Sequence, residues 1–412
     1  MTSLSDAIPS LDPGCVPPSI RGVAALSHLA YAGADEAALF RAIERPTPDL
    51  TAAAAYALDA ATIHALSGRA AAAAALQRQA LAGGALYRPV DSLGARSAAP
   101  LRLLALLAPG DMMANTPLDF ITMHLDVRLD LLFVAPGRAL PPVLPEHDVA
   151  FFAAADSDPA VLGRLAALQA LWPRPTLNDP ARVLRLSREA LATALRGRPG
   201  LVVPPIRRVP RDLAAAGAAI AAIDYPALIR PVGSHAGHGL ARVTTAAELQ
   251  SYCAGNEAAE FFVSRFIDYA GADGLYRKYR IALIAGRPFL CHMAVSSHWM
   301  VHYLNAGMAG SAAKRAEEAA AMATFDTGFA QRHAAALAAI AEWAGLDYVQ
   351  IDCAELPDGR LLLFEADVAG IVHMMDPPAL FPYKPPQMRR VIRAFGALLA
   401  AAAERRTLRP AA

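Results

Sequence analysis

The stretch YVQIDCAELPDGRLLLFEADVAG, which runs from Tyr348 to Gly370, decides how this chain is interpreted. VQIDCAEL is typical of a strand, PDG of a turn, and RLLLFEAD of the returning strand of a hairpin. Asp352, Glu365 and Asp367 alternate along these strands, so we expect the three carboxylates to face one side together. Hard oxygen ligands suit magnesium, and an acidic cluster between apolar neighbours is costly without a cation. The hairpin therefore predicts a magnesium site, with a solvated acidic face as the alternative.

A glycine-rich segment, ALIRPVGSHAGHG, lies upstream of this hairpin between two short strand-like runs. Gly233, Gly237 and Gly239 allow backbone N–H groups to turn toward a ligand, so this loop, with Ser234, is a candidate for holding phosphate oxygens. Arg230, just before the loop, supplies positive charge for the phosphates. The segment is not a Walker A motif, because it lacks the Gly-Lys-Ser/Thr ending, and a plain hairpin turn is the alternative.

The glycine-rich segment, followed later in the chain by the acidic hairpin, resembles the motif order of the ATP-grasp superfamily. The resemblance covers roughly residues 201–400. The preceding part resembles the pre-ATP-grasp domain of glutathione synthetase-like and ribosomal-protein glutamate ligase-like members. PLRLLALLAPGDMMANTPLDF, GLYRKYRIALIAGRPF, HWMVHYLNAGM and LLFEADVAGIVH are similar to a bacterial group with an N-terminal tetratricopeptide-like segment. The resemblance implies an α/β chain whose last part has the α+β ATP-grasp fold and binds ATP with Mg²⁺ (or Mn²⁺).

The resemblance also assigns roles to residues of the nucleotide site. Arg230 stands where the family usually has a lysine, and it keeps the charge. The strand EFFVSRFID corresponds to the hinge between the two ATP-grasp lobes. The backbone near Arg265 and Phe266 would contact the adenine edge, and Asp268 would reach the ribose. Taken without the resemblance, the same segment is a strand at the edge of a core.

Further roles fall on the region after the hinge. In RKYRIALIAGRPF, Arg280 corresponds to the arginine that opens the next strand and contacts phosphate or acyl phosphate, and Lys278 adds a cation for the nucleotide. Asn305 resembles an asparagine near the transferred phosphate in some relatives. Asp352 and Glu365 of the acidic hairpin match the family's magnesium ligands. The family's third ligand is an asparagine, whereas this chain has Asp367, which can still coordinate magnesium.

Histidines offer a competing metal site. His292, His298 and His302 are spaced by six and four residues, which would suit zinc in a metal-dependent hydrolase if the segment turned twice. His235 and His238 in the glycine loop form a second candidate pair. Neither group has an acidic residue close in sequence that could serve as a general base or ligand. We therefore favour a pocket-lining role for the first group and hydrogen bonding to phosphate for the second.

The composition excludes several classes of protein. The 38 Lys and Arg residues balance 37 Asp and Glu residues, so no overall basic field attracts nucleic acid or anionic lipid. No apolar run approaches the roughly 18 residues of a membrane span. MTSLSDAIPS lacks the pattern of a signal peptide, and the four cysteines are scattered. We therefore expect a cytoplasmic protein without nucleic-acid or membrane partners.

Three parts are expected along the chain. Residues 1–97 are rich in Ala and Leu with helical periodicity, and Thr51–Pro89 resembles one tetratricopeptide-type helical hairpin. Residues 98–200 alternate strand and helix patterns, which predicts a pre-ATP-grasp α/β domain with a parallel sheet. Residues 201–412 form the ATP-grasp domain, with its hinge near 261–268. The N-terminal helices dock either on the chain's own α/β domain or on a protein partner.

These features predict an ATP-dependent carboxylate–amine (or carboxylate–thiol) ligase. A small-molecule or peptide carboxylate would attack the γ-phosphate of ATP to give an acyl phosphate, which the amine acceptor would capture with release of phosphate. Two alternatives remain open at this stage. One is a small-molecule kinase on the same fold, which would stop after phosphoryl transfer. The other is a nucleotide-binding adaptor without ligase activity.

Overall fold

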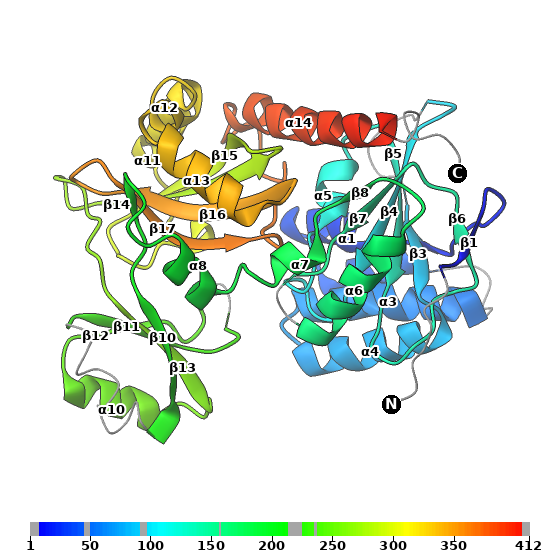
Figure 1. Ribbon diagram of the computed structural model, residues 1–412, viewed down its shortest axis with the longest axis horizontal. Helices are drawn as coiled ribbons and strands as arrows, with labels where there is room; N and C mark the ends of the chain where they lie inside the picture. The colour runs from blue at the N-terminus through cyan, green and yellow to red at the C-terminus, as the bar shows by residue number, and fades with distance from the viewer. Residues whose placement is uncertain are drawn as a thin grey trace. The chain divides into compact units, whose positions relative to one another are not determined.

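A computed structural model of the protein describes residues 8–44, 50–90, 97–155, 158–212, 225–234 and 237–405. The chain is a mixed α/β protein, as predicted, and its helices and strands divide between two compact units (Figure 1). The first unit comprises Met1–Leu184, Leu346–Val349 and Asp367–Ala412. The second unit comprises Arg185–Gly345 and Gln350–Ala366. The division expected from the sequence, at residues 97 and 200, stays a prediction about domains.

A six-stranded sheet forms the centre of the first unit, with its strands in the order β2-β3-β5-β4-β7-β8. β4 runs parallel to both β5 and β7, as the alternation of strands and helices predicted, whereas β3 is antiparallel to β5. β1 pairs with β6 outside this sheet. The strands are β1 (Ser10–Asp12), β2 (Ser19–Ile20), β3 (Leu86–Pro89), β4 (Leu101–Leu107), β5 (Val127–Phe133), β6 (Val143–Pro145), β7 (Val149–Phe152) and β8 (Thr176–Leu177).

One helix of the first unit, α6, begins at residues that suit a helix start. Asp158 accepts a hydrogen bond from the N–H of Ala160 at 2.9 Å, and Pro159 follows at the first helical position. The last helix, α14, places Phe395 against Phe151 of β7, with ring centroids 6.0 Å apart. The helices of this unit are α5 (Leu118–Thr122), α6 (Pro159–Leu171), α7 (Pro180–Val183) and α14 (Lys384–Glu404), besides four N-terminal ones.

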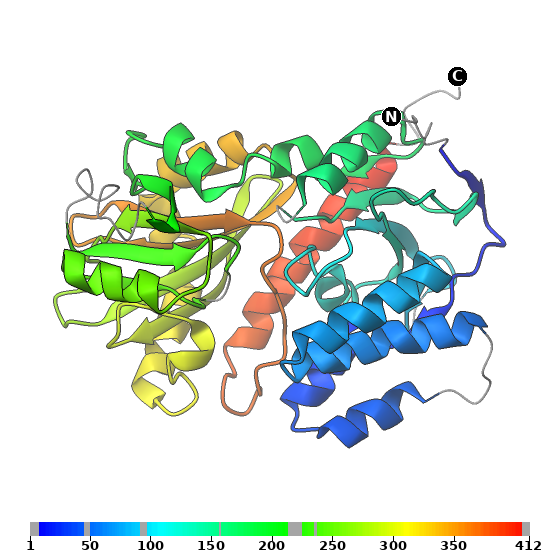
Figure 2. The ribbon, with the colours of Figure 1, turned by 90° about the horizontal axis from the view of Figure 1, so that it is seen from below.

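The N-terminal helices pack into the same unit. They are α1 (Val23–Tyr31), α2 (Glu36–Ile43), α3 (Leu50–Leu66) and α4 (Ala70–Gly83). α3 and α4 lie side by side as the predicted helical hairpin, which turns at Gly68 with a φ of 74° (Figure 2). Gln77 of α4 exchanges two hydrogen bonds with the backbone of Gly110, at 2.7 and 2.9 Å. The tetratricopeptide character of this hairpin stays a prediction.

An antiparallel sheet of four strands lies in the second unit, in the order β10-β13-β11-β12. α10 (Ala246–Ala254) covers it, because Leu249 and Cys253 share a buried cluster with strand residues such as Ile229 and Phe261. β13 lies between two neighbours rather than at an edge, and it ends at Arg265. The strands are β10 (Ile206–Pro210), β11 (Ala227–Pro231), β12 (Ala241–Val243) and β13 (Glu260–Arg265).

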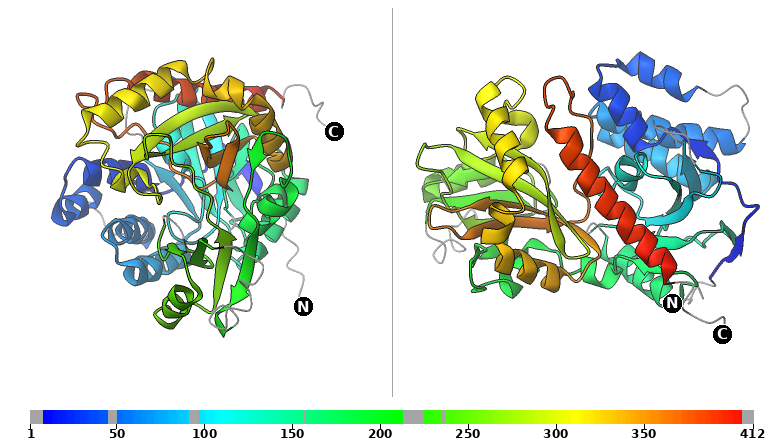
Figure 3. Two further views of the ribbon diagram at one scale, coloured as in Figure 1. Left: turned by 90° about the vertical axis from the view of Figure 1, so that its left-hand side faces the viewer. Right: turned by 90° about the horizontal axis from the view of Figure 1, so that it is seen from above.

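A second sheet has five strands in the order β15-β14-β16-β17-β9. Three helices, α11 to α13, lie over it (Figures 1 and 3). β16 and β17 are the hairpin predicted from the sequence. The strands are β9 (Leu201–Val202), β14 (Tyr276–Ile284), β15 (Arg287–Ser296), β16 (Tyr348–Glu355) and β17 (Leu361–Asp367). The remaining helices are α8 (Arg188–Ala194), η1 (Tyr303–Asn305), α11 (Ala312–Thr324), α12 (Phe329–Arg332) and α13 (Ala334–Ala344).

Candidate active site

Asp352 lies at the centre of a group of charges in the second unit. It is on β16, a strand buried over almost its whole length, and only 2% of the residue is exposed. Lys278 and Arg280 of β14 both form ion pairs with it, at 2.7 and 2.8 Å. Burial alone would raise the pKa of this carboxyl, but the charges of Arg280 and Lys278 outweigh burial and hold that pKa well below its usual value. Asp352 is therefore ionised at neutral pH.

The alternation of β14 explains why two of its three cations join this group. Lys278 and Arg280 point to the same face of the strand because side chains alternate with a period of two. Arg277, one residue before Lys278, points to the other face and pairs with Asp273 and Glu317. The sequence placed Arg280 at the opening of its strand, whereas β14 begins at Tyr276 and Arg280 lies inside it.

Glu365 of β17 is the second carboxylate of the group. It accepts a hydrogen bond from Arg188 at the start of α8. Burial raises the pKa of Glu365, but Arg188 and the cations of β14 outweigh burial and the repulsion from Asp352, so this pKa is lowered. The charge of Asp352 acts on the pKa of Glu365, so the two carboxylates belong to one electrostatic group, and their role as metal ligands stays a prediction. Sequence reasoning missed Arg188, because nothing in its local sequence connects it to strands so far along the chain.

Arg230 completes the group from the other sheet of the unit. Its guanidinium binds the side chain and the backbone carbonyl of Ser234, and the Nε–Oγ distance is 3.0 Å. Burial and, after it, the neighbouring charge of Arg188 lower the pKa of Arg230 to about 10, while Glu365 opposes the change. Arg230 still carries its charge at neutral pH. We call the six residues Arg188, Arg230, Lys278, Arg280, Asp352 and Glu365 the charged cluster.

The glycine loop begins next to the charged cluster. Gly233, Gly237 and Gly239 have φ values of 78°, 77° and 66°, in the left-handed region that glycine adopts without strain. A Cβ added at Gly239 would lie 2.8 Å from the ring of Pro231, so this position needs glycine for space as well. His238 is part of the same loop, while His235 lies outside the described residues. The loop geometry is thus compatible with backbone N–H groups that face a phosphate.

The predicted hinge lies just after β13. The N–H of Phe266 donates to the carbonyl of Pro226 at 2.9 Å, so this group is used inside the sheet. The ring of Phe266 is buried, with the guanidinium of Arg242 4.4 Å from its centroid. Arg265 and Asp268 are exposed, and the carboxylate of Asp268 accepts from the N–H of Ala270. Adenine and ribose contacts by these residues stay predictions.

Other predicted residues lie in local contacts of their own. Asn305 is exposed in η1 and accepts a hydrogen bond from the N–H of His302 at 3.0 Å. Asp367 is the last residue of β17, on the same face as Glu365, and accepts from the N–H of Ala369 at 2.8 Å. A catalytic role for Asn305 and a ligand role for Asp367 remain to be tested.

Three-ligand metal sites are absent from the part of the chain that the structure describes. No three His, Cys, Asp or Glu residues there lie in an arrangement that could hold a metal ion. The alternative zinc site at His292, His298 and His302 is therefore not formed. Two carboxylates, Asp352 and Glu365, remain as the acidic part of the charged cluster, so any metal there needs additional ligands from a bound substrate.

No helix within the described residues is long and apolar enough to cross a membrane.

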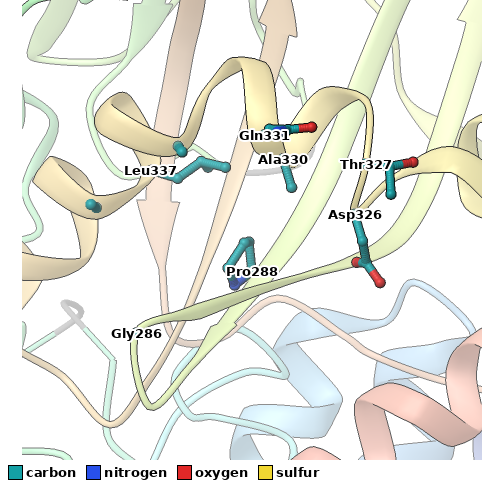
Figure 4. A pocket seen from close by; sticks show the side chains of 9 residues that line it. Gly286, Pro288, Asp326, Thr327, Ala330, Gln331 and Leu337 are labelled. Carbon is teal, nitrogen blue, oxygen red and sulfur yellow. The ribbon is translucent and has the colours of Figure 1, made fainter.

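A pocket of about 530 Å³ lies elsewhere in the second unit (Figure 4). The turn between β14 and β15 lines one side of it, through Gly286 and Pro288, and residues of α12 and α13 such as Ala330 and Leu337 line the other. Asp326 adds a polar side chain. None of the lining residues belongs to the charged cluster, so we do not connect this pocket with the chemistry of that site.

No family model matches the sequence, and no curated protein does. The chain is similar in structure to a RimK domain ATP-grasp protein from Sphaerobacter thermophilus, with 19% identity and a TM-score of 0.41 over 73% of this chain and 99% of that chain. It is also similar to the D-alanine–D-alanine ligase of Coxiella burnetii, with 13% identity and a TM-score of 0.46 over 74% and 96% of the two chains.

A third similar structure is the D-alanine–D-alanine ligase of Bacillus anthracis, which was determined with ATP. It has 12% identity and a TM-score of 0.42, over 76% of this chain and 100% of that chain. At these identities and TM-scores the similarity says nothing about the reaction, which has to be argued from the residues of the site.

Proposed function

We propose that this protein is an ATP-grasp ligase, which uses ATP and Mg²⁺ to activate a carboxylate for capture by an amine (or a thiol). The observation that carries the proposal is the charged cluster. Its four cations and two carboxylates leave a net charge of two positive around the nearly fully buried Asp352. A triphosphate bound to magnesium is a net anion, and guanidinium groups are suited to its oxygens by charge and by geometry.

The donor set of the cluster fits magnesium. Asp352 and Glu365 offer hard carboxylate oxygens from neighbouring strands, and magnesium in proteins is usually held by one or two carboxylates together with substrate phosphates. Asp367, the last residue of β17, is proposed as a further ligand only once the nucleotide is bound, because no three such residues of the described chain lie together as a metal site. When bound, the ion would neutralise phosphate charge and act as a Lewis acid toward the transferred phosphoryl group.

The other residues bind and orient the nucleotide in this proposal. Arg230, with the glycine loop that follows it, holds the inner phosphates, and Arg188 reaches the same region from α8. Arg280 and Lys278 place positive charge where charge develops on the transferred phosphoryl group. The backbone near Phe266 contacts adenine. No side chain serves as a covalent nucleophile, so positioning and electrostatic stabilisation supply the catalysis.

The reaction has two balanced steps. An oxygen of the substrate carboxylate forms a bond to the γ-phosphorus while the bond from that phosphorus to the bridging oxygen breaks, which gives an acyl phosphate and ADP. The amine nitrogen then bonds to the acyl carbon, and the bond from that carbon to the phosphate oxygen breaks. The amine loses a proton to solvent or to the departing phosphate. A small molecule or a peptide end can serve as the carboxylate.

We also propose that the protein works in the cytoplasm, where ATP is supplied. Cys15, Cys253, Cys291 and Cys353 are free thiols, which fits a reducing compartment. The hydrogen bonds between Gln77 and Gly110 support a structural role for the N-terminal helices over a role in binding a protein partner.

The test is release of ADP from ATP by the full chain, with carboxylates and amines supplied from pools. A ligase should need both a carboxylate and an amine, and mass spectrometry should find their condensed product. A kinase would release ADP with one substrate alone and yield a phosphorylated product. An adaptor would bind ATP in calorimetry without turnover. Equal ATP affinity with Mg²⁺ and with EDTA would reject the metal-dependent site.

A further inference from the structure

Both carboxylates of the charged cluster are already engaged by cations of the protein. Asp352 receives Nε and Nη2 of Arg280 at 2.8 and 3.0 Å and Nζ of Lys278 at 2.7 Å, so donors occupy both of its oxygens. Glu365 is paired with Arg188. The Asp352 side chain is 3% exposed, so water competes little for these bonds. In this arrangement the carboxylates of Asp352 and Glu365 are therefore not available together as ligands for a metal ion.

A divalent cation that arrives alone meets two obstacles. It has to displace a guanidinium or ammonium group from a charge-assisted hydrogen bond, and it then lies beside the displaced positive charge at low solvation. The excess of cations over carboxylates in the cluster makes both obstacles larger. A polyphosphate removes them, because it gives the displaced groups of Arg188, Lys278 and Arg280 new anionic oxygens to bind.

We propose that these ion pairs close the carboxylates to metal until a polyphosphate arrives, and that the polyphosphate then exchanges the partners. The basic side chains move to phosphate oxygens, and Asp352 and Glu365 become free to hold the metal ion. Binding of metal is thus conditional on binding of nucleotide. This inference rests on the proposed function, because it requires the charged cluster to be the place where nucleotide and metal meet.

The experiment measures binding of Mn²⁺ to the full chain by the enhancement of water-proton relaxation, which distinguishes Mn²⁺ on the slowly tumbling protein from Mn²⁺ on a small ligand. Without phosphate, the wild-type protein should give no enhancement at Mn²⁺ concentrations that saturate it in the presence of inorganic tripolyphosphate. Arg188→Gln removes the partner of Glu365, so this variant should bind Mn²⁺ alone about tenfold more tightly than the wild type, or better.

Arg332→Gln is the matched control. Arg332 also forms a two-pronged pair with a carboxylate of β16, at 2.9 and 2.7 Å from the oxygens of Glu355, but it lies outside the charged cluster. This variant should behave as the wild type does. Lys278→Gln, which loosens Asp352, replaces Arg188→Gln if circular dichroism shows that the latter does not fold. Its expected gain in Mn²⁺ affinity has the same direction.

The inference is overturned if the wild type binds Mn²⁺ as tightly alone as with tripolyphosphate, or if a folded Arg188→Gln or Lys278→Gln variant gains no affinity. These outcomes are distinct from failure of the proposed function. If ATP and Mn²⁺ bind together while Mn²⁺ also binds well alone, only the closure by ion pairs is wrong. If neither ATP nor Mn²⁺ with tripolyphosphate binds the wild type, the proposed function fails and this inference fails with it.

Discussion

Arg280 on β14 binds Asp352 on β16 through two parallel hydrogen bonds, from Nε to Oδ1 at 2.8 Å and from Nη2 to Oδ2 at 3.0 Å. The planar fork of the guanidinium matches the carboxylate, and burial of both groups makes the pairing strong while it lasts. Burial works against the charge of Arg280, yet Asp352 raises the pKa of this guanidinium above its usual value. The pair therefore joins two permanently charged groups of neighbouring strands.

Replacing Asp352 by Asn should destabilise the protein and abolish ADP release. The change leaves Arg280 and Lys278 buried without a counter-charge, and breaking a buried ion pair from one side costs about 3–5 kcal/mol. Urea unfolding at neutral pH measures the loss. Glu355→Gln, on the same strand but paired with the exposed Arg332, should cost less than about 1 kcal/mol. An Asp352→Asn variant as stable as the wild type would contradict the energetic role of the pair.

Arg280 and Arg230 should affect different steps of turnover. Arg280→Lys keeps a charge for Asp352 but loses the fork, so we expect kcat to fall roughly tenfold to hundredfold with little change in the KM for ATP, as for a contact made in the transition state. Arg230→Lys should mainly raise the KM for ATP, because Arg230 shapes the loop that holds phosphates. Steady-state kinetics at varied ATP concentration measures both effects. Exchange of the two patterns would reject these assignments.

His147 predicts a pH dependence for the stability of the first unit. Its Nδ1–H donates to the carbonyl of Pro145 at 2.9 Å and its Nε2 accepts from the indole of Trp172 at 3.0 Å, so the buried ring is neutral. Burial lowers its pKa from 6.5 to about 4. Between these two values the unfolded chain binds the extra proton, so stability rises with pH in this window and falls on acidification.

From pH 7.5 to pH 5 the loss from this one group is about 2 kcal/mol. The measurement is urea unfolding, followed by circular dichroism, at the two pH values. In His147→Gln the amide can still accept from Trp172 but does not titrate, so its pH dependence should be smaller by the same amount. Identical pH dependence in the variant and the wild type would show that His147 does not titrate on unfolding.

A chain that begins at Ala98 should be poorly soluble or much less stable than the full chain. It lacks β2 and β3 of the six-stranded sheet and the buried apolar cluster of α1, α2 and α3. Gln77→Ala is the milder variant: it removes two hydrogen bonds to Gly110 and should cost about 1–2 kcal/mol. Size-exclusion chromatography and thermal unfolding report the result. A monomeric, stable and fully active shortened chain would favour the partner-binding role.

The sequence by itself determined the local elements. The β16–β17 hairpin was predictable because its apolar runs and the Pro-Asp-Gly turn act over neighbouring residues, and α3 and α4 were predictable from their periodicity. The proximity of Asp352 and Glu365 followed from the same hairpin. Strand ends were less accurate: β14 starts before Arg280, because pairing with β15 continues back to Tyr276.

Only the tertiary structure decided which charges meet. Nothing in the local sequence indicated that Arg188 pairs with Glu365. The structure surrounds the carboxylates of Asp352 and Glu365 with Arg188, Lys278 and Arg280. Periodicity acts through neighbouring residues and is written in the local sequence. The energy of an ion pair depends on distance and solvation between groups far apart along the chain, and these are fixed only when the strands and helices have packed.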